Sequence, residues 1–166
     1  MSAGEIREEA AVNAPPDESA RNVAPADLTR VYEDGRIRVS WYAGRCIHSG
    51  ACLRALPAAF NPQRRPWVDL SGGDADAIAA AVERCPTGAL EYERLDGGPQ
   101  ESAEEHPRVV PVRNGPLFAR GDIEVKDEQG RVIRRGKRIA FCRCGRSAHL
   151  PFCDNTHRAI GFRTNG

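Results

Sequence analysis

The segment from Cys142 to His157 constrains this chain most, because it cannot fold on its own apolar side chains. It reads CRCGRSAHLPFCDNTH and combines three cysteines and two histidines with almost no apolar periodicity. Short segments of this kind depend on disulfides or a bound metal for their fold. The chain has 166 residues and six cysteines, and only 6% of its residues are aromatic. Divided into two modules, such a chain is expected to have marginal cores that need this support.

Charge and hydropathy exclude several classes of partner. Basic and acidic residues number 24 and 23, so no overall field favours nucleic acid or a membrane surface. No stretch approaches the ~18 to 20 apolar residues of a membrane span. Residues 1–28 are polar and rich in proline and alanine, so we expect a disordered segment rather than a secretory signal. We therefore expect a cytoplasmic protein, in which disulfides are disfavoured.

Periodicity predicts an α+β protein with two small modules. The first, residues 29–95, is expected to be an α/β unit in which Ile37, Val39 and Trp41 share one strand face. Its expected elements are a strand over RIRVSWY (36–42), a short helix through Leu53 and Leu56, a strand over PWVDL (66–70), a helix within 71–85 that starts near Asp74, and a strand over ALEYE (89–93).

Polar residues punctuated by Gly and Pro predict a linker over 96–107. The second module, residues 108–166, is expected to be mostly β. Its strands are predicted over VVPVRNGPLF, DIEVKD and VIRRGKRIAFC, with turns at Asn114-Gly115 and at 128–130. The basic runs RVIRRGKR (131–138) and PQRRP (62–66) are expected to be solvated surface.

The spacing of the second module's cysteines favours a metal centre. Cys142 and Cys144 are separated by one residue, a poor arrangement for their own disulfide but a good one for two thiolates at one centre. Cys153 and His157 fall on one helix face if Asp154 caps a short helix. From ligand types alone, a Cys3His zinc site is an equal alternative.

At fixed offsets, this run resembles the CDGSH iron–sulfur family, also called NEET proteins. The pattern C-x-C-x2-(S/T)-x3-P-x-C-D-G-(S/A/T)-H is matched by Cys142, Cys144, Ser147, Pro151, Cys153, Asp154, Thr156 and His157. The resemblance covers about 108–163. It implies a [2Fe–2S] cluster with the first two cysteines on one iron and Cys153 and His157 on the other, with Ser147 and Asp154 beside it.

The resemblance has consequences for the turn at Asn155 and for the chemistry of the cluster in the second module. Asn155 stands where the family has glycine, and asparagine is the other residue that best tolerates a positive φ, so the turn is expected to survive. A neutral imidazole in place of a thiolate raises the reduction potential of a cluster. It must also be deprotonated to ligate, so acid is expected to release the cluster.

The first module contains the other three cysteines. Cys46 and Cys52 lie in RCIHSGAC, and Cys85 lies in RCPTGAL. A ferredoxin loop for a four-iron cluster reads C-x2-C-x2-C with a remote Cys-Pro. Here Cys46 and Cys52 occupy the outer positions, Ser49 the middle one, and Cys85 precedes Pro86. Buried structural thiols are the alternative interpretation.

The stretch 31–94 resembles the divergent single-cluster ferredoxin family, which is often found beside CDGSH modules. That family is described as a [4Fe–4S] type, whereas three thiolates directly fit a [3Fe–4S] cluster. We favour three irons on ligand count and keep [4Fe–4S] open. Its fourth ligand would be His48, Ser49, a small molecule or water.

These features predict an electron carrier with two clusters that relays electrons to or from a partner oxidoreductase. No acid–base pair or activated nucleophile is visible, so we expect no enzyme activity in this chain alone. The alternatives are a cluster donor or a redox or pH sensor that uses the labile His-ligated cluster, a structural zinc protein, and an accessory subunit of a larger oxidoreductase. The expected partner is a redox protein, and a homodimer is also expected.

Overall fold

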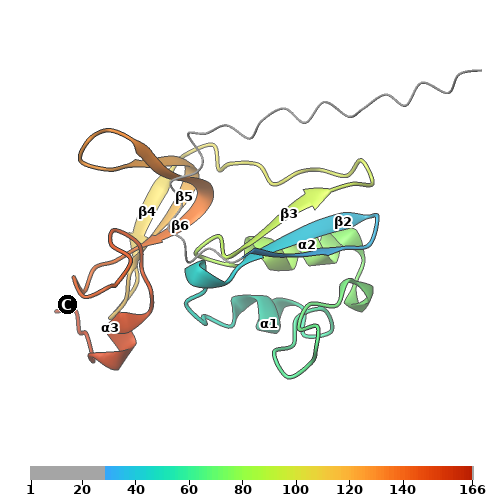
Figure 1. Cartoon of the computed structure of the whole chain (residues 1–166), viewed down its shortest axis with the longest axis horizontal. Coiled ribbons are helices and arrows are strands. Elements are labelled where there is room, and N and C mark those ends of the chain that lie inside the picture. The colour runs from blue at the N-terminus through green and yellow to red at the C-terminus, as the bar shows by residue number, and fades with distance from the viewer. Residues whose placement is uncertain (1–28, 166) are drawn as a thin grey trace, which may run out of the picture.

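The computed structural model describes residues 29–165 and places two modules side by side (Figure 1). Each contains one three-stranded antiparallel sheet, and the helices are few and short. This confirms the predicted α+β class. The predicted disordered segment, residues 1–28, lies outside the described residues. Across 29–165, no helix is both long enough and apolar enough to cross a membrane.

The first module is a sheet with two helices. Its strands run in the order β1-β2-β3 and its core lies between the sheet and α2. Ile37 and Val39 on β2 are fully buried against Ile78 and Val82 of α2. The Asp74 carboxylate caps α2 by accepting from Ala77 N at 2.7 Å. The elements are β1 (Thr29–Glu33), β2 (Ile37–Tyr42), α1 (Ala51–Ala55), α2 (Ala75–Glu83) and β3 (Leu90–Arg94), with short 3-10 turns at Ala43–Arg45 and Leu70–Gly72.

The predicted strand over residues 66–70 is wrong. This stretch forms only an isolated bridge between Phe60 and Val68. Pro66 has no N–H for a sheet ladder, and the Asp69 side chain accepts from Ser71 N at 3.0 Å, which turns the chain. Trp67 instead packs edge-on against Trp41, with ring centroids 5.0 Å apart.

The second module is a twisted sheet followed by the cysteine-rich loop. Its elements are β4 (Arg108–Pro111), β5 (Leu117–Lys126), β6 (Val132–Phe141) and α3 (Thr156–Ala159). Asn114 and Gly130 adopt positive φ in the predicted turns. The separate strand predicted over DIEVKD is wrong, because it continues β5 through an irregularity between Arg120 and Ile123.

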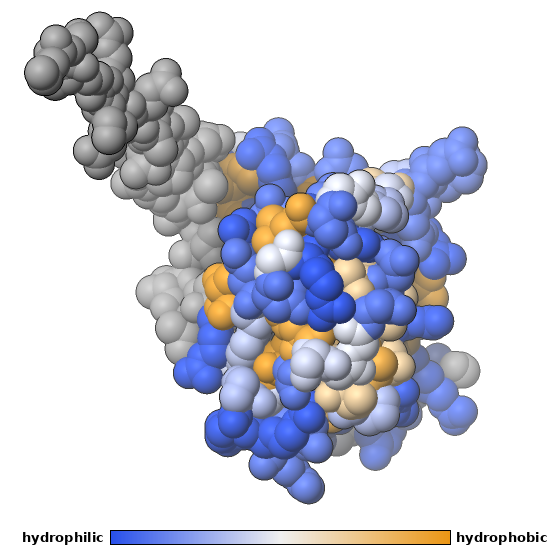
Figure 2. All heavy atoms as spheres, turned by 90° about the vertical axis from the view of Figure 1, so that its right-hand side faces the viewer, coloured by the Kyte–Doolittle hydropathy of each residue, from blue (hydrophilic) through white to orange (hydrophobic). Residues whose placement is uncertain are grey.

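Strand β6 lies against the first module, and this corrects the interpretation of RVIRRGKR as solvated surface. Arg134 and Arg138 are 8% and 2% exposed. Alternate residues of a strand point to one face, and here the first module covers that face. The end of the molecule formed by the first module is mostly hydrophilic, with small groups of apolar side chains among charged ones (Figure 2).

Candidate metal centres

In the second module, the backbone brings the four predicted ligands together. Cys142 follows β6 directly, and its N–H donates to Pro151 O at 2.8 Å. The Cys153 N–H donates back to Ala140 O at 2.9 Å, which holds the two halves of the loop side by side. His157 lies in α3, but Cys153 precedes this helix and its N-cap is Asn155, so the predicted cap at Asp154 and the shared helix face are wrong. Cys153 and His157 are each 7% exposed.

The four ligand atoms fall into two close pairs. Cys142 Sγ lies 3.7 Å from Cys144 Sγ, and Cys153 Sγ lies 3.5 Å from His157 Nδ1. A tetrahedral metal with bonds of about 2.3 Å to sulfur and about 2.0 Å to nitrogen sets such pairs roughly 3.8 and 3.5 Å apart. Nowhere in residues 29–165 do three His, Cys, Asp or Glu side chains converge on a single metal position. The geometry therefore fits two metal atoms with two ligands each.

Ser147, Asp154 and Asn155 shape this loop. The Ser147 hydroxyl is buried and accepts from His149 N at 3.0 Å. The Asp154 carboxylate accepts from Ala148 N and Thr156 N, each at 2.9 Å, and so ties both sides of the ligand set. Asn155 has φ 76°, which confirms that asparagine supports the turn. Its side-chain oxygen is buried without a hydrogen-bond partner in the described residues.

Burial and hydrogen bonds shift the pKa values of three ligands in the second module. Burial disfavours the Cys142 thiolate, but N–H groups of Ser147 and Gly145 directed at its sulfur outweigh this and lower its pKa. Burial raises the pKa of Cys153 and lowers that of His157. The imidazole is therefore kept neutral, the form that ligates a metal.

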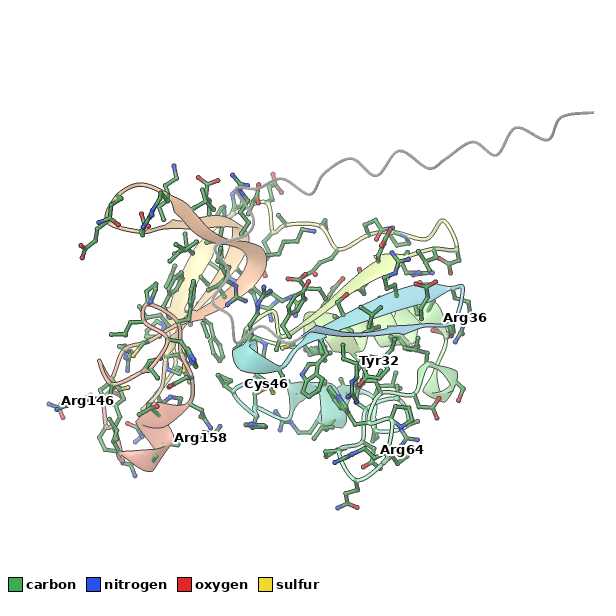
Figure 3. All side chains as sticks on the ribbon, viewed as in Figure 1. Tyr32, Arg36, Cys46, Arg64, Arg146 and Arg158 are labelled. Carbon is green, nitrogen blue, oxygen red and sulfur yellow. The ribbon has the colours of Figure 1, made fainter. Side chains whose placement is uncertain are left out.

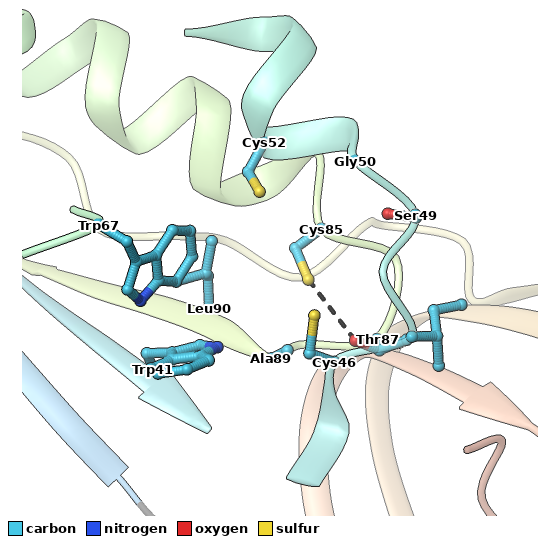
Figure 4. Close-up of a pocket in the computed structure, with 11 residues that line it drawn as sticks. Trp41, Cys46, Ser49, Gly50, Cys52, Trp67, Cys85, Thr87, Ala89 and Leu90 are labelled. Atoms are coloured by element: carbon cyan, nitrogen blue, oxygen red, sulfur yellow. Dashed lines mark hydrogen bonds between the residues drawn. The ribbon is translucent and has the colours of Figure 1, made fainter. Parts of the chain in front are cut away.

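In the first module, the side chains of Cys46, Cys52 and Cys85 line one cavity, and Figure 4 shows their sulfur atoms directed into it. Cys46 follows the 3-10 turn after β2, Cys52 lies in α1, and Cys85 follows α2. Cys46 is at the side of the first module that faces the second (Figure 3). The sequence reasoning missed Thr87, whose hydroxyl oxygen lies 3.5 Å from Cys85 Sγ; its only signal was its place in CPTGAL.

The protonation state of the free thiols fits a cavity that binds a metal through cysteine sulfur atoms. Burial raises the pKa of Cys46, and it raises that of Cys52 to about 11, so each free thiol keeps its proton until a metal displaces it. Trp67 lines the cavity, and its indole nitrogen is buried without a hydrogen-bond partner in the described part of the chain. Figure 4 shows this nitrogen on the side of the ring away from the three sulfur atoms.

Ser49 and His48 take different positions at this site. Ser49 lines the cavity, and its hydroxyl accepts from Ala51 N at 3.3 Å. His48 is exposed, and its Nδ1 lies 3.9 Å from Cys46 Sγ. In a four-iron cubane each iron takes one protein ligand, so the ligands stand farther apart than two ligands of one metal. The position of Ser49 suits a fourth corner better than that of His48.

Comparison with known proteins agrees with this geometry in both modules. Residues 32–95 match the family described as a divergent 4Fe-4S mono-cluster, and residues 114–158 match the iron-binding zinc finger of CDGSH type. Over 63 residues the chain is 35% identical to the uncharacterized protein YjdI of Escherichia coli K12, a match that spans 38% of this chain and 83% of that protein. The YjdI protein of strain O157:H7 matches equally. The chain is thus an iron–sulfur protein that belongs, through its first module, to the divergent 4Fe-4S mono-cluster family and carries a CDGSH module fused behind it.

Proposed function

We propose that this protein is an electron carrier that passes electrons between two clusters and a partner oxidoreductase. Cys142, Cys144, Cys153 and His157 would hold a [2Fe–2S] cluster, and the three cysteines of the first module would hold the other. When bound, such clusters supply one-electron donors and acceptors. The observation that carries the proposal is a contact: Ile47, next to Cys46, is buried in one apolar cluster with Cys153 and Ala140.

This contact brings the two ligand sets together without a second protein. Ile47 is 5% exposed and comes from the loop between Cys46 and α1. Cys153 on the opposite side is also buried, so water is kept from the space between the two ligand loops. A relay needs such a dry, fixed junction, whereas a cluster donor needs ligands that an acceptor protein can reach. The burial of Cys153 and His157 therefore supports electron transfer over cluster donation.

For the first module, the cysteine count and the family description support different clusters. Three thiolates fit [3Fe–4S], whereas the matched family is described as a four-iron type. A [4Fe–4S] cluster would take its fourth ligand from Ser49, a small molecule or water. Electron paramagnetic resonance separates the two, since an oxidised [3Fe–4S] cluster gives a signal directly and a [4Fe–4S] cluster of this class only after reduction.

An open groove beside the first site is the proposed docking place for an acidic redox partner. We name it the entry groove; it is lined by Cys46 and Cys52 together with Trp41, Trp67, Arg30, His48 and Arg65. In the described part of the chain, no Asp or Glu is among its lining residues. Arg64 and Arg65 follow one another in the loop beside it, where Arg64 is partly paired with Asp69 at 3.6 Å. Positive charge next to a redox centre steers an anionic partner toward it.

Charge reversal in the entry groove tests this docking. Arg30→Glu combined with Arg65→Glu is expected to slow oxidation of the reduced protein by ferricyanide about tenfold at low salt. Oxidation by the cationic tris(phenanthroline)cobalt(III) is expected to become faster, and both effects should shrink as salt screens the charges. Stopped-flow absorbance measures both rates. Arg131→Glu combined with Arg135→Glu, on the exposed β5–β6 hairpin, changes the net charge equally and is the matched control.

Equal rates in the variant and the control at low salt would remove the entry groove from the electron path.

The relay itself is tested by cycles of reduction and reoxidation of the purified protein. Reversible reduction with both clusters retained is the expected result. Appearance of the [2Fe–2S] cluster in an apo-ferredoxin under the same conditions would instead favour cluster donation.

A further inference from the structure

Strand β6 of the CDGSH module inserts one arginine into the cysteine loop of the other module. Arg138 is 2% exposed. Its Nη1 donates to Val82 O at 2.7 Å and to Cys85 O at 2.6 Å, and its Nη2 donates to Leu90 O at 2.9 Å. These carbonyls belong to the end of α2, to a cluster ligand and to the start of β3. One side chain thus holds both ends of the segment that carries Cys85.

The remaining donors of Arg138 are taken by a linker carboxylate. Its Nε donates to Glu101 Oε1 at 2.7 Å and its Nη2 to Glu101 Oε2 at 3.0 Å. Guanidinium has five N–H donors, and these contacts use all five. The Glu101 side chain is 12% exposed, so the ion pair is mostly shielded from water. The Nη1 edge of the guanidinium faces Cys85, and the Nε edge faces Glu101. Of the two charged groups, the positive guanidinium is therefore the one on the side of the cluster site.

Two further contacts press the same segment against β6. Arg134 donates to the carbonyl of Thr87, the residue whose hydroxyl lies beside Cys85 Sγ. Gly88 has φ +65°, and a Cβ placed there would lie 2.7 Å from the Arg138 carbonyl oxygen. Only glycine allows this approach without displacing one backbone or the other. The contact is therefore specific to this loop shape.

We propose that the first cluster site is composite: Arg138 is a positioning residue for Cys85, and the Arg138–Glu101 pair sets the reduction potential of the first cluster. The proposal rests on the proposed function only in requiring that Cys85 bind a cluster. The matched 63 residues make up 83% of the YjdI relatives, so those proteins have no length for a second module with such an arginine. The contact is a property that the fusion adds.

Loss of the arginine has two separable effects. Three backbone carbonyls lose a charged donor, so the Cys85 segment loosens. The Glu101 carboxylate is also left buried without its counter-charge, and a negative charge near a cluster disfavours the reduced, more negative state. Loss of Glu101 alone acts oppositely on the potential, because it leaves the positive guanidinium in place.

The experiment compares Arg138→Gln, Arg138→Lys, Glu101→Gln and the double variant Arg138→Gln/Glu101→Gln in the full chain. Redox titration followed by electron paramagnetic resonance gives the potential of each cluster, and a ferrous chelator gives the rate of its loss. Arg138→Gln is expected to lower the potential of the first cluster and to speed its loss roughly tenfold or more, since three hydrogen bonds from a charged donor disappear. Glu101→Gln is expected to raise that potential.

The double variant separates charge from position. It should return the potential toward the original value while the first cluster is still lost quickly, and Arg138→Lys should restore charge but only part of the retention. Arg135→Gln, on the same strand but paired with Glu124 in solvent, is the matched control. Equal shifts in both clusters, or no shift in Glu101→Gln, would overturn the proposal. Absence of any cluster on Cys85 in the unaltered chain would instead contradict the proposed function.

Discussion

Cys85→Ser is expected to abolish the cluster of the first module and to leave that of the CDGSH module in place. Cys85 is 8% exposed, and its thiol faces the cavity that Cys46 and Cys52 also line. A serine hydroxyl is a far weaker ligand than a thiolate, and two remaining cysteines cannot hold a three- or four-iron cluster. About three or four irons per chain should disappear, with matching loss of acid-labile sulfide.

Cys153→Ser is the reciprocal control for this selectivity. It removes a ligand of the other set, so about two irons should be lost and the first module's signal should persist. Circular dichroism in the far ultraviolet checks that each variant stays folded. Identical iron loss in the two variants would mean that the six cysteines serve one site, which contradicts the account of two separate centres.

His157→Cys is expected to protect the [2Fe–2S] cluster from acid. Burial lowers the pKa of His157 below its ordinary value of 6.5, so the folded protein favours the neutral imidazole. Stability from this neutral ligand is complete above the ordinary pKa and is lost as pH falls through the lowered one. Cluster loss in the original chain should accelerate by up to about tenfold per pH unit as pH falls from the ordinary pKa to the lowered one, because one proton is taken up over that range, and should level off below it. The cysteine variant should show a weaker dependence.

Decay of the visible absorbance between pH 5 and 8 measures this effect. Asp154 does not confuse the result: although burial opposes its ionisation, hydrogen bonds from Thr156 and Ala148 lower its pKa to about 2. Its stabilising contacts are lost only as pH falls from about 4 toward 2, well below the window for His157. His149→Gln is the matched control, since His149 is exposed in the same loop. Equal acid loss in His157→Cys and the original chain would exclude His157 as the labile ligand.

Local patterns in the sequence account for much of the fold. Alternation of Ile37 and Val39 identified β2, and Asp74 marked the start of α2, because each signal depends on neighbours along the chain. The strand over 66–70 was mispredicted because Trp67 and Val68 are apolar for another reason, namely to close the cavity wall and the core. An apolar residue indicates that its position is buried, but it does not indicate whether that position lies in a strand, a helix or a loop.

The ligand spacing also predicted which side chains converge, but not what surrounds them. Thr87 and Trp67 line the first site through tertiary packing that no spacing rule encodes. The basic run that contains Arg134 and Arg138 predicts solvated surface because most such runs lie on exposed strands or loops. The first module covers the face of β6 that carries them, and the sequence of β6 alone contains no information on its neighbour.

Iron, zinc and acid-labile sulfide analysis of anaerobically purified protein, together with electron paramagnetic resonance, tests the central claim most directly. The account predicts two distinct cluster signals, with about five irons per chain for [2Fe–2S] plus [3Fe–4S] and about six for the four-iron version. A colourless protein with about one zinc per chain and no sulfide would contradict it.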